Sequence, residues 1–156
     1  MSTSPLPAAF PEVIVHFRME DGCADLAPRK AHHDDAAYDL RARVDATLAP
    51  GKIGLVPTGL FLELPEGVEA QVRPRSGLAY KHGILVPNSP GTIDAGYRGE
   101  VCVILLNAGE QEFPVRRGDR IAQLVIQRLT PVELVPAAVL GGTKRGAGGF
   151  GSTGVA

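Results

Sequence analysis

The sequence predicts an all-β domain, built as a closed barrel or a two-layered sandwich with little helix. Nineteen glycines and thirteen prolines divide the chain into short apolar runs at regular spacing, which is typical of proteins with many strands. Turn sequences stand between these runs. No stretch shows the sustained apolar periodicity of a long helix.

Nine apolar runs are the predicted strands, at residues 13–17, 38–41, 52–57, 60–64, 69–73, 99–107, 112–115, 121–128 and 132–135. Four turn sequences separate neighbouring runs: Ala49-Pro50-Gly51, Pro65-Glu66-Gly67, Asn107-Ala108-Gly109 and Arg117-Gly118-Asp119. Residues 76–82 can form one or two helical turns. We expect one domain over residues 1–136 and a flexible C-terminal arm over residues 137–156.

Composition excludes several functional classes. A net charge of -1 argues against direct nucleic-acid binding, which needs a surplus of basic residues. No apolar run approaches the length of about 18 residues that spans a membrane, and the first residues lack a signal-peptide pattern. The two cysteines, Cys23 and Cys102, are expected to be free thiols in a reducing cytoplasm.

The segment from Gly91 to Glu100 surrounds Asp94 and Tyr97 with turn residues, just before an apolar run. This placement predicts that both side chains lie at the mouth of a hairpin. One interpretation is structural, with Asp94 capping the turn and Tyr97 packing over it. The other is functional, with the carboxylate and the ring facing a ligand.

Three further segments carry polar groups with two possible roles each. Ser76, after a predicted strand, is either an ordinary helix N-cap or an anion-binding hydroxyl. Asp39 lies within a short strand, where a carboxylate needs a partner, either an arginine or hydrated Mg²⁺. Gln123 alternates with Ile121 and Val125, which predicts a buried amide that is either satisfied in the core or directed at a ligand.

The C-terminal sequence Arg145-Gly146-Ala147-Gly148-Gly149-Phe150-Gly151-Ser152-Thr153-Gly154 has the composition of a phosphate-binding loop. Glycines let backbone N–H groups approach an anion, and the Arg145 guanidinium and two hydroxyls add donors. Such loops usually precede a helix, yet no helix is expected here. The segment is therefore either a disordered end or an arm that closes over a phosphate held elsewhere.

Taken together and in this order, these five segments resemble the five motifs of the trimeric dUTPase family. The match extends from Asp34 to Gly154, about three quarters of the chain, and includes PRSGLA, GTIDAGYRGE, RGDRIAQL and RGAGGFGSTG. The resemblance implies a jelly-roll-like homotrimer whose active sites are shared between subunits. It implies Mg²⁺-dependent cleavage of dUTP to dUMP and diphosphate, which limits uracil in DNA and supplies dUMP for dTMP synthesis.

The resemblance also assigns roles to residues. Asp94 would activate the attacking water, with Gln123 supporting the water and the phosphate, and Asp39 would contact the hydration shell of Mg²⁺. Tyr97 would stack on the deoxyribose and exclude a 2′-hydroxyl. The uracil edge would be bound by Asn88 and by the hairpin backbone at Thr92, Ile93 and Cys102. Phosphates would be bound by Arg75, Ser76 and Gly77, and the closing arm would contain Arg145, Phe150, Gly151, Ser152 and Thr153, with Phe150 on the uracil.

One residue departs from the family pattern. Ala37 occupies a position where the family usually has glycine, and a positive φ there would cost on the order of 1 kcal/mol.

Two other functions compete with this one. The dCTP deaminase family shares the fold, but it has a catalytic glutamate where this chain has Ile104, and it lacks the glycine-rich arm. A non-catalytic nucleotide-binding regulator is the other alternative, and the intact Asp94, Tyr97 and Gln123 argue against it.

Overall fold

The computed structural model describes residues 12–149 and confirms the all-β prediction. Ten strands and two short helices follow in the order β1 His16–Met19, η1 Ala24–Leu26, β2 Tyr38–Arg41, β3 Ala46–Leu48, β4 Ile53–Glu63, β5 Val68–Arg73, α1 Ser76–His82, β6 Ile84–Leu85, β7 Gly91–Ile93, β8 Glu100–Asn107, β9 Phe113–Val115 and β10 Arg120–Arg128. Within these residues no helix is long and apolar enough to cross a bilayer.

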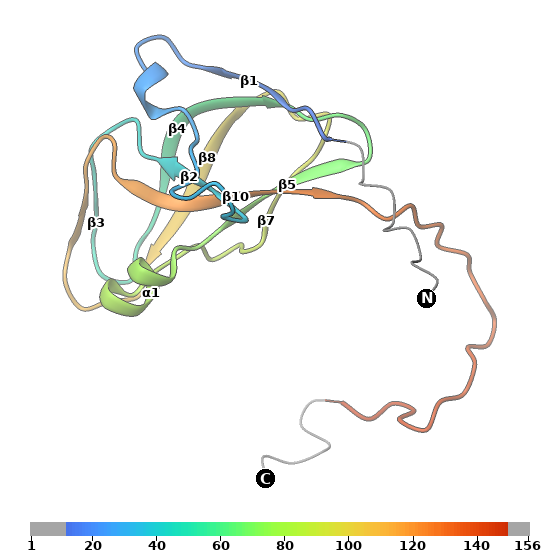
Figure 1. Ribbon diagram of the computed structural model, residues 1–156. Helices are drawn as coiled ribbons and strands as arrows, with labels where there is room; N and C mark the ends of the chain where they lie inside the picture. Colours follow the sequence, from blue (N-terminus) through green and yellow to red (C-terminus); the bar gives the residue numbers. More distant parts are fainter. Residues whose placement is uncertain (1–11, 150–156) are drawn as a thin grey trace, which may run out of the picture.

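Two four-stranded sheets enclose the core, and a third sheet pairs only β3 with β9 (Figure 1). The first large sheet has the order β1-β4-β8-β6, and the second has the order β2-β10-β5-β7. All pairings are antiparallel. Because consecutive strands alternate between sheets, each sheet depends on contacts between residues far apart in sequence.

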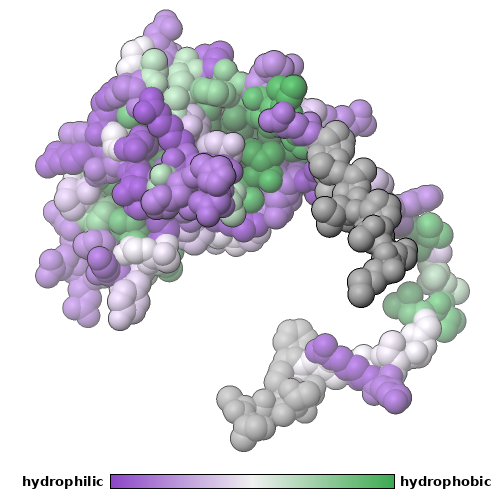
Figure 2. All heavy atoms as spheres, viewed as in Figure 1, coloured by the Kyte–Doolittle hydropathy of each residue, from purple (hydrophilic) through white to green (hydrophobic). Residues whose placement is uncertain are grey.

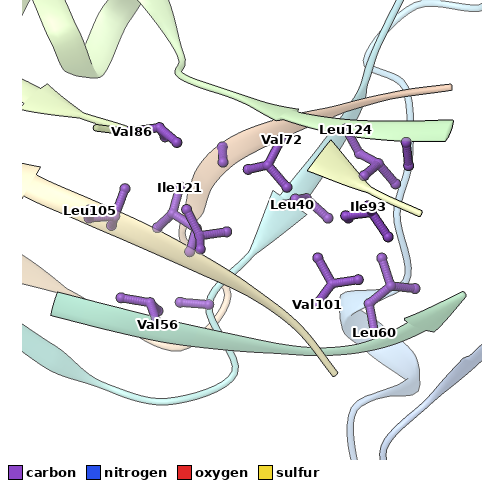
Figure 3. Packing of buried hydrophobic residues seen from close by; sticks show 14 of the residues in the cluster. Leu40, Val56, Leu60, Val72, Val86, Ile93, Val101, Leu105, Ile121 and Leu124 are labelled. Carbon is purple, nitrogen blue, oxygen red and sulfur yellow. The ribbon is translucent and has the colours of Figure 1, made fainter. Parts of the chain in front are cut away.

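Alternating side chains of the two large sheets build the core (Figure 3). In β8 the burial pattern is strictly alternate, with Val101, Val103 and Leu105 almost completely buried. The opposing sheet contributes Leu40, Val72 and Ile121. Burial of such apolar surface is the main favourable term in folding, at about 25 cal/mol per Å².

The predicted strands 52–57 and 60–64 are one strand, β4, with a bulge between Pro57 and Leu60. Gly59 adopts φ +73° in this bulge, a conformation that favours glycine. The Thr58 hydroxyl donates to the Val101 carbonyl (2.5 Å) and accepts from the Leu60 N–H (3.2 Å). These two hydrogen bonds replace the backbone pairing between β4 and β8 that the bulge interrupts. The strand therefore continues through the Pro57-Thr58-Gly59 sequence, which on its own predicts a turn.

Other predicted boundaries need correction. Strand β1 begins three residues later than predicted, and β3, β6 and β7 were not predicted because each has only two or three residues. The predicted strand at residues 132–135 is wrong. After β10 the described chain forms no strand and leaves the body (Figure 1), and Val132, Leu134 and Val135 are 72–91% exposed.

Asn107 is a fully buried polar residue at the end of β8. Its amide group donates to the carbonyls of Leu48 (2.8 Å) and Gln111 (2.7 Å), while its side-chain oxygen accepts from the Gly109 N–H (2.9 Å). One side chain thus closes the β8–β9 turn and ties it to β3.

We expect Asn107→Ala to lower the free energy of unfolding by about 3 kcal/mol, because it leaves buried backbone groups without hydrogen-bond partners. Urea denaturation measures this loss, with Glu110→Ala, an exposed change in the same turn, as the control. Equal stabilities for the two variants would contradict the role assigned to Asn107.

Candidate active site

Three neighbouring strands of the second sheet bring Asp39, Gln123 and Arg73 into one row. Gln123 on β10 lies opposite Asp39 of β2 and opposite Arg73 of β5. Directly opposed residues of antiparallel strands are about 5 Å apart, so their side chains are immediate neighbours. The row therefore joins three of the sequence segments that carry candidate functional residues.

Asp39 has arginine partners, one of the two alternatives that the sequence left open. Its carboxylate is 3.2 Å from Arg120 Nη1 and 3.7 Å from Arg75 Nε, and the residue is 9% exposed. Arg75 also donates to the Arg120 carbonyl (2.9 Å). In the described residues, no group of three or more His, Cys, Asp or Glu side chains could hold a metal.

The predicted helix at residues 76–82 is confirmed, but Ser76 is its first residue and not its N-cap. Arg75 occupies the N-cap position with extended backbone, and no side chain caps the helix. Ser76 and Gly77 are exposed. The first N–H groups of a helix lack internal partners, and the Ser76 hydroxyl accompanies them, beside the Asp39–Arg75 pair.

Asp94 and Tyr97 lie in the turn that joins β7 to β8, as predicted, but these two strands belong to different sheets and do not pair with each other. The predicted hairpin is therefore a connection between the two sheets, and residues 91–102 are called the hairpin below. The Tyr97 N–H donates to the Asp94 carbonyl (3.0 Å), and the Tyr97 hydroxyl donates to the Glu100 carbonyl (3.0 Å). A Cβ on Gly99 would collide with the Tyr97 ring and hydroxyl, so the hydroxyl end of the ring lies against this glycine. The Asp94 side chain is exposed and makes no hydrogen bond to the described residues.

The two arms of this hairpin present unpaired backbone edges. Strand β7 is the last strand of its sheet, and β6 pairs only with Leu106 and Asn107 of β8. The backbone of β8 near Cys102 therefore has no strand partner on that edge among residues 12–149. Asn88 lies close to β7, because a Cβ on Gly91 would be 2.9 Å from its Nδ2.

Cys102 is half-buried on β8, opposite Pro57 of β4. Burial, with a smaller contribution from the Glu100 carboxylate, raises the pKa of its thiol. The side chain therefore stays a neutral thiol at physiological pH.

Glu100 fixes the base of the hairpin to the β4 bulge. Its carboxylate accepts from Arg43 Nε (2.7 Å) and from the Gly59 N–H (2.7 Å). Burial alone would raise the pKa of Glu100, but the hydrogen bonds from Arg43 and Gly59 outweigh it and hold that pKa below its ordinary value of 4.5. The carboxylate is therefore ionised at neutral pH, and the clamp is intact.

Asp39, Arg75, Ser76 and Arg120 form what we call the Arg75 cluster. Within one chain, this cluster lies far from the hairpin that carries Asp94. Ile93 lies opposite Ala70, so Asp94 is level with Glu69, six residues along β5 from Arg75. At about 3.3 Å per residue, this separation is roughly 20 Å. One small reacting group therefore cannot contact Asp94 and Arg75 of the same chain at the same time.

The C-terminal segment also lies away from both clusters. Residues 129–149 leave the body (Figure 1), and Arg145 is exposed, with its Nε donating to the Gly148 carbonyl (2.7 Å). Gly146 has φ +52°, as expected of a glycine in a tight turn. Phe150, Gly151, Ser152 and Thr153 lie outside the described residues.

A separate groove of about 620 Å³ contains none of the predicted site residues. Its walls include Val13, Ile14 and Phe17 beside the first sheet and Leu124 and Ile126 of β10. Figure 2 shows hydrophobic surface on the folded β domain and again along the C-terminal segment. In that segment Leu134, Val139 and Leu140 are at least 84% exposed.

No role was predicted from the sequence for two residues near Asp39 and Gln123, namely Arg120 and Arg73. Arg120 pairs with Asp39 from the start of β10, and Arg73 lies in the row beside Gln123. Arg73 had a readable signal, because its two-residue spacing from Arg75 places both on the same side of an extended segment. The bulge between Arg120 and Ala122 buries both Ile121 and Ala122, so Ile121 does not share the face of the half-buried Gln123.

The family model for dUTPase matches residues 25–154. A deoxyuridine 5'-triphosphate nucleotidohydrolase of Rhizobium leguminosarum bv. trifolii is 60% identical over 124 residues, covering 77% of this chain and 80% of that protein. The protein of that name from Caulobacter vibrioides is 51% identical over 157 residues, covering 97% and 99%.

A solved structure with a similar fold is the Staphylococcus bacteriophage 80alpha dUTPase G164S mutant with dUpNHpp. It superposes with a TM-score of 0.83 at 25% sequence identity, covering 91% of this chain and 99% of that one.

The Glu100 clamp predicts a pH-dependent stability. A carboxylate whose pKa is lowered by folding stabilises the fold fully above its unfolded pKa and loses that contribution as the pH falls through its folded pKa. Glu100→Gln should therefore be less stable than the unaltered protein from pH 6 to 8, and the gap should shrink progressively below pH ~4.5. Chemical denaturation across this range measures it, and a gap that does not change with pH would argue against an ionised clamp.

Proposed function

Because the chain belongs to the dUTPase family, we propose that it cleaves dUTP at the α-phosphate by attack of a water molecule that Asp94 activates. Its activity is that of a deoxyuridine 5'-triphosphate nucleotidohydrolase, which releases dUMP and diphosphate. The observation that supports a site shared between copies is the separation of roughly 20 Å between Asp94 and Arg75 along the chain of β5.

This separation supports active sites that are shared between chains. The hairpin with Asp94 and Tyr97 of one copy would meet the Arg75, Ser76 and Gln123 cluster of a second. The segment from residue 137 onward, with Arg145, would come from a third copy as a closing arm. A closed ring of three copies repeats this contact three times and completes three sites, which is the geometry of a heterologous cyclic interface. The proposed assembly is therefore a homotrimer, as the family resemblance implies.

The hairpin supplies selectivity for a uracil base on a deoxyribose. Unpaired backbone groups of Thr92, Ile93 and Cys102 can donate to and accept from the uracil edge, and the Asn88 amide adds a side-chain contact. The Tyr97 ring stacks on the sugar. Held over Gly99, the ring leaves no space for a 2′-hydroxyl, so ribonucleotides are rejected by steric exclusion.

The Arg75 cluster binds the triphosphate. Arg75 offers a planar guanidinium, Ser76 and Gly77 offer exposed donors at the start of α1, and Gln123 supports the reacting phosphate and the water. When the arm closes, the Arg145 guanidinium, the hydroxyls of Ser152 and Thr153 and the Gly151 backbone add donors, and Phe150 covers the uracil. Closure excludes bulk water and strengthens these electrostatic contacts.

In the chemical step the water oxygen forms a bond to the α-phosphorus, and the water proton passes to the Asp94 carboxylate. The bond between the α-phosphorus and the oxygen that bridges to the β-phosphate breaks, and diphosphate leaves. The arginines stabilise the negative charge that develops on the phosphoryl oxygens.

The dUTPase family implies Mg²⁺. In this chain Asp39 is the residue that would hold it, through the water molecules around the ion. Because Asp39 is already paired with two arginines, and no group of three or more potential metal ligands occurs among residues 12–149, it suits contact with the ion's hydration shell and not direct ligation. Mg²⁺ bound to the phosphates would offset their charge.

A panel of nucleotides tests the proposed substrate. Diphosphate release should be fast with dUTP and at least about a hundredfold slower with UTP, dCTP, dTTP and dATP, because a site that binds by hydrogen bonds and steric fit rejects analogues by such factors. Comparable turnover of UTP would contradict the exclusion of the 2′-hydroxyl by Tyr97. Turnover of dCTP to a uracil product would favour the deaminase alternative.

Mixing two inactive variants tests the shared site. Asp94→Asn should bind nucleotide but lower kcat by several orders of magnitude, since the amide cannot accept the proton. Arg75→Gln, which keeps donors for the Arg120 carbonyl, should also be nearly inactive. Co-refolded in equal amounts, the two should recover about a quarter of normal activity, because a quarter of randomly assembled sites contain both intact residues. No recovery would place both residues of one chain in one site.

A further inference from the structure

The outer face of β5 carries a line of polar side chains that ends at the phosphate-binding cluster. Glu69, Gln71 and Arg73 alternate with the buried Val68, Ala70 and Val72. Alternate residues of a strand point to the same face, and Arg75 continues the line with extended backbone.

Arg73 is held in a defined orientation by this line. Its Nε (3.1 Å) and Nη2 (2.7 Å) both donate to Oε1 of Gln71, and Gln71 Nε2 in turn donates to Glu69 Oε1 (2.7 Å). Two hydrogen bonds to one oxygen fix the plane of the guanidinium, which reduces the entropy lost when it binds an anion.

The charge of Arg73 is not neutralised by a neighbouring carboxylate. Arg75 and Arg120 share Asp39, whereas Arg73 forms no ion pair with any residue between 12 and 149, and its Nη1 donates to none of them. Its closest bonded partner is the neutral amide of Gln71. A half-buried cation without a counterion is costly, so the arrangement favours an anion from outside the chain.

The position of Arg73 identifies that anion. Arg73 lies directly opposite Gln123, which lies opposite Asp39, and Arg75 is two residues away on the same face. Under the proposed function, this is where the triphosphate binds. We propose that Arg73 is a further substrate-binding residue, whose guanidinium binds a phosphoryl oxygen of dUTP beside Gln123. The inference rests on the proposed function and adds a cation that the family resemblance did not assign.

Binding of fragments tests this role in the full-length protein. In Arg73→Ala, the Kd for inorganic diphosphate and the KM for dUTP should each rise about tenfold or more, the usual loss for a charge-assisted hydrogen bond. The Kd for deoxyuridine, which has no phosphate, should not change. Arg73→Lys should recover part of the loss, because it restores the charge without the planar fork. Calorimetry and steady-state kinetics measure these values.

Arg18→Ala is the matched control, since it also removes one positive charge but from the first sheet, where Arg18 stacks on Phe61 at 3.6 Å. It should leave all three values unchanged. Melting temperature and molecular mass are measured for every variant.

The outcomes separate the two proposals. An unaltered protein that does not hydrolyse dUTP would refute the proposed function itself. An active protein in which Arg73→Ala leaves the diphosphate Kd unchanged, or weakens deoxyuridine equally, would refute only the role of Arg73. A loss of assembly mass in Arg73→Ala would also refute it, because it would show that Arg73 pairs with a carboxylate of another copy.

Discussion

The pairing of β7 with β5 is the constraint on which the rest of the site depends. This register fixes the distance between the hairpin that carries Asp94 and the cluster that contains Arg75, and both elements belong to the same rigid sheet. No side-chain rotation can close a gap of roughly 20 Å. Under the proposed function, the chain therefore presents two half-sites, and each half is completed by the other half of another copy.

Each half-site is organised around one carboxylate that is paired with arginine. Asp39 holds Arg75 and Arg120 together in the phosphate-binding half, and Glu100 holds Arg43 and the β4 bulge beneath the hairpin. Both carboxylates are largely buried and satisfied by donors, which is the condition for a buried charge to be tolerated. The carboxylate assigned to chemistry, Asp94, differs from both because it is exposed and makes no hydrogen bond within the described chain.

Sequence reasoning predicted the parts of this fold that depend on local pattern. The strand at residues 38–41 and the helix at 76–82 were predicted with the boundaries found, because the residues that flank them, such as Pro74 and Gly83 on either side of the helix, favour turns. It failed where long-range pairing decides the outcome. The two- and three-residue strands β6 and β7 exist only because β8 and β5 lie beside them, and the apolar residues 132–135 lack a strand to pair with in one chain.

The same limit applies to the site. The motifs identified Asp94, Tyr97 and Arg75, but the choice of arginine as the partner of Asp39, and the row that adds Arg73, depend on the register of β2, β10 and β5.

Under the proposed function, the unpaired edges of β7 and β8 have a consequence for how the base preference can change. A slot that recognises uracil through main-chain groups keeps its pattern of donors and acceptors whichever side chains the strands carry. Only a proline, which lacks the N–H group, or a shift in register would alter that pattern. Drift in side chains such as Cys102 would therefore leave the choice of base intact, and a new base preference would require rebuilding the hairpin backbone.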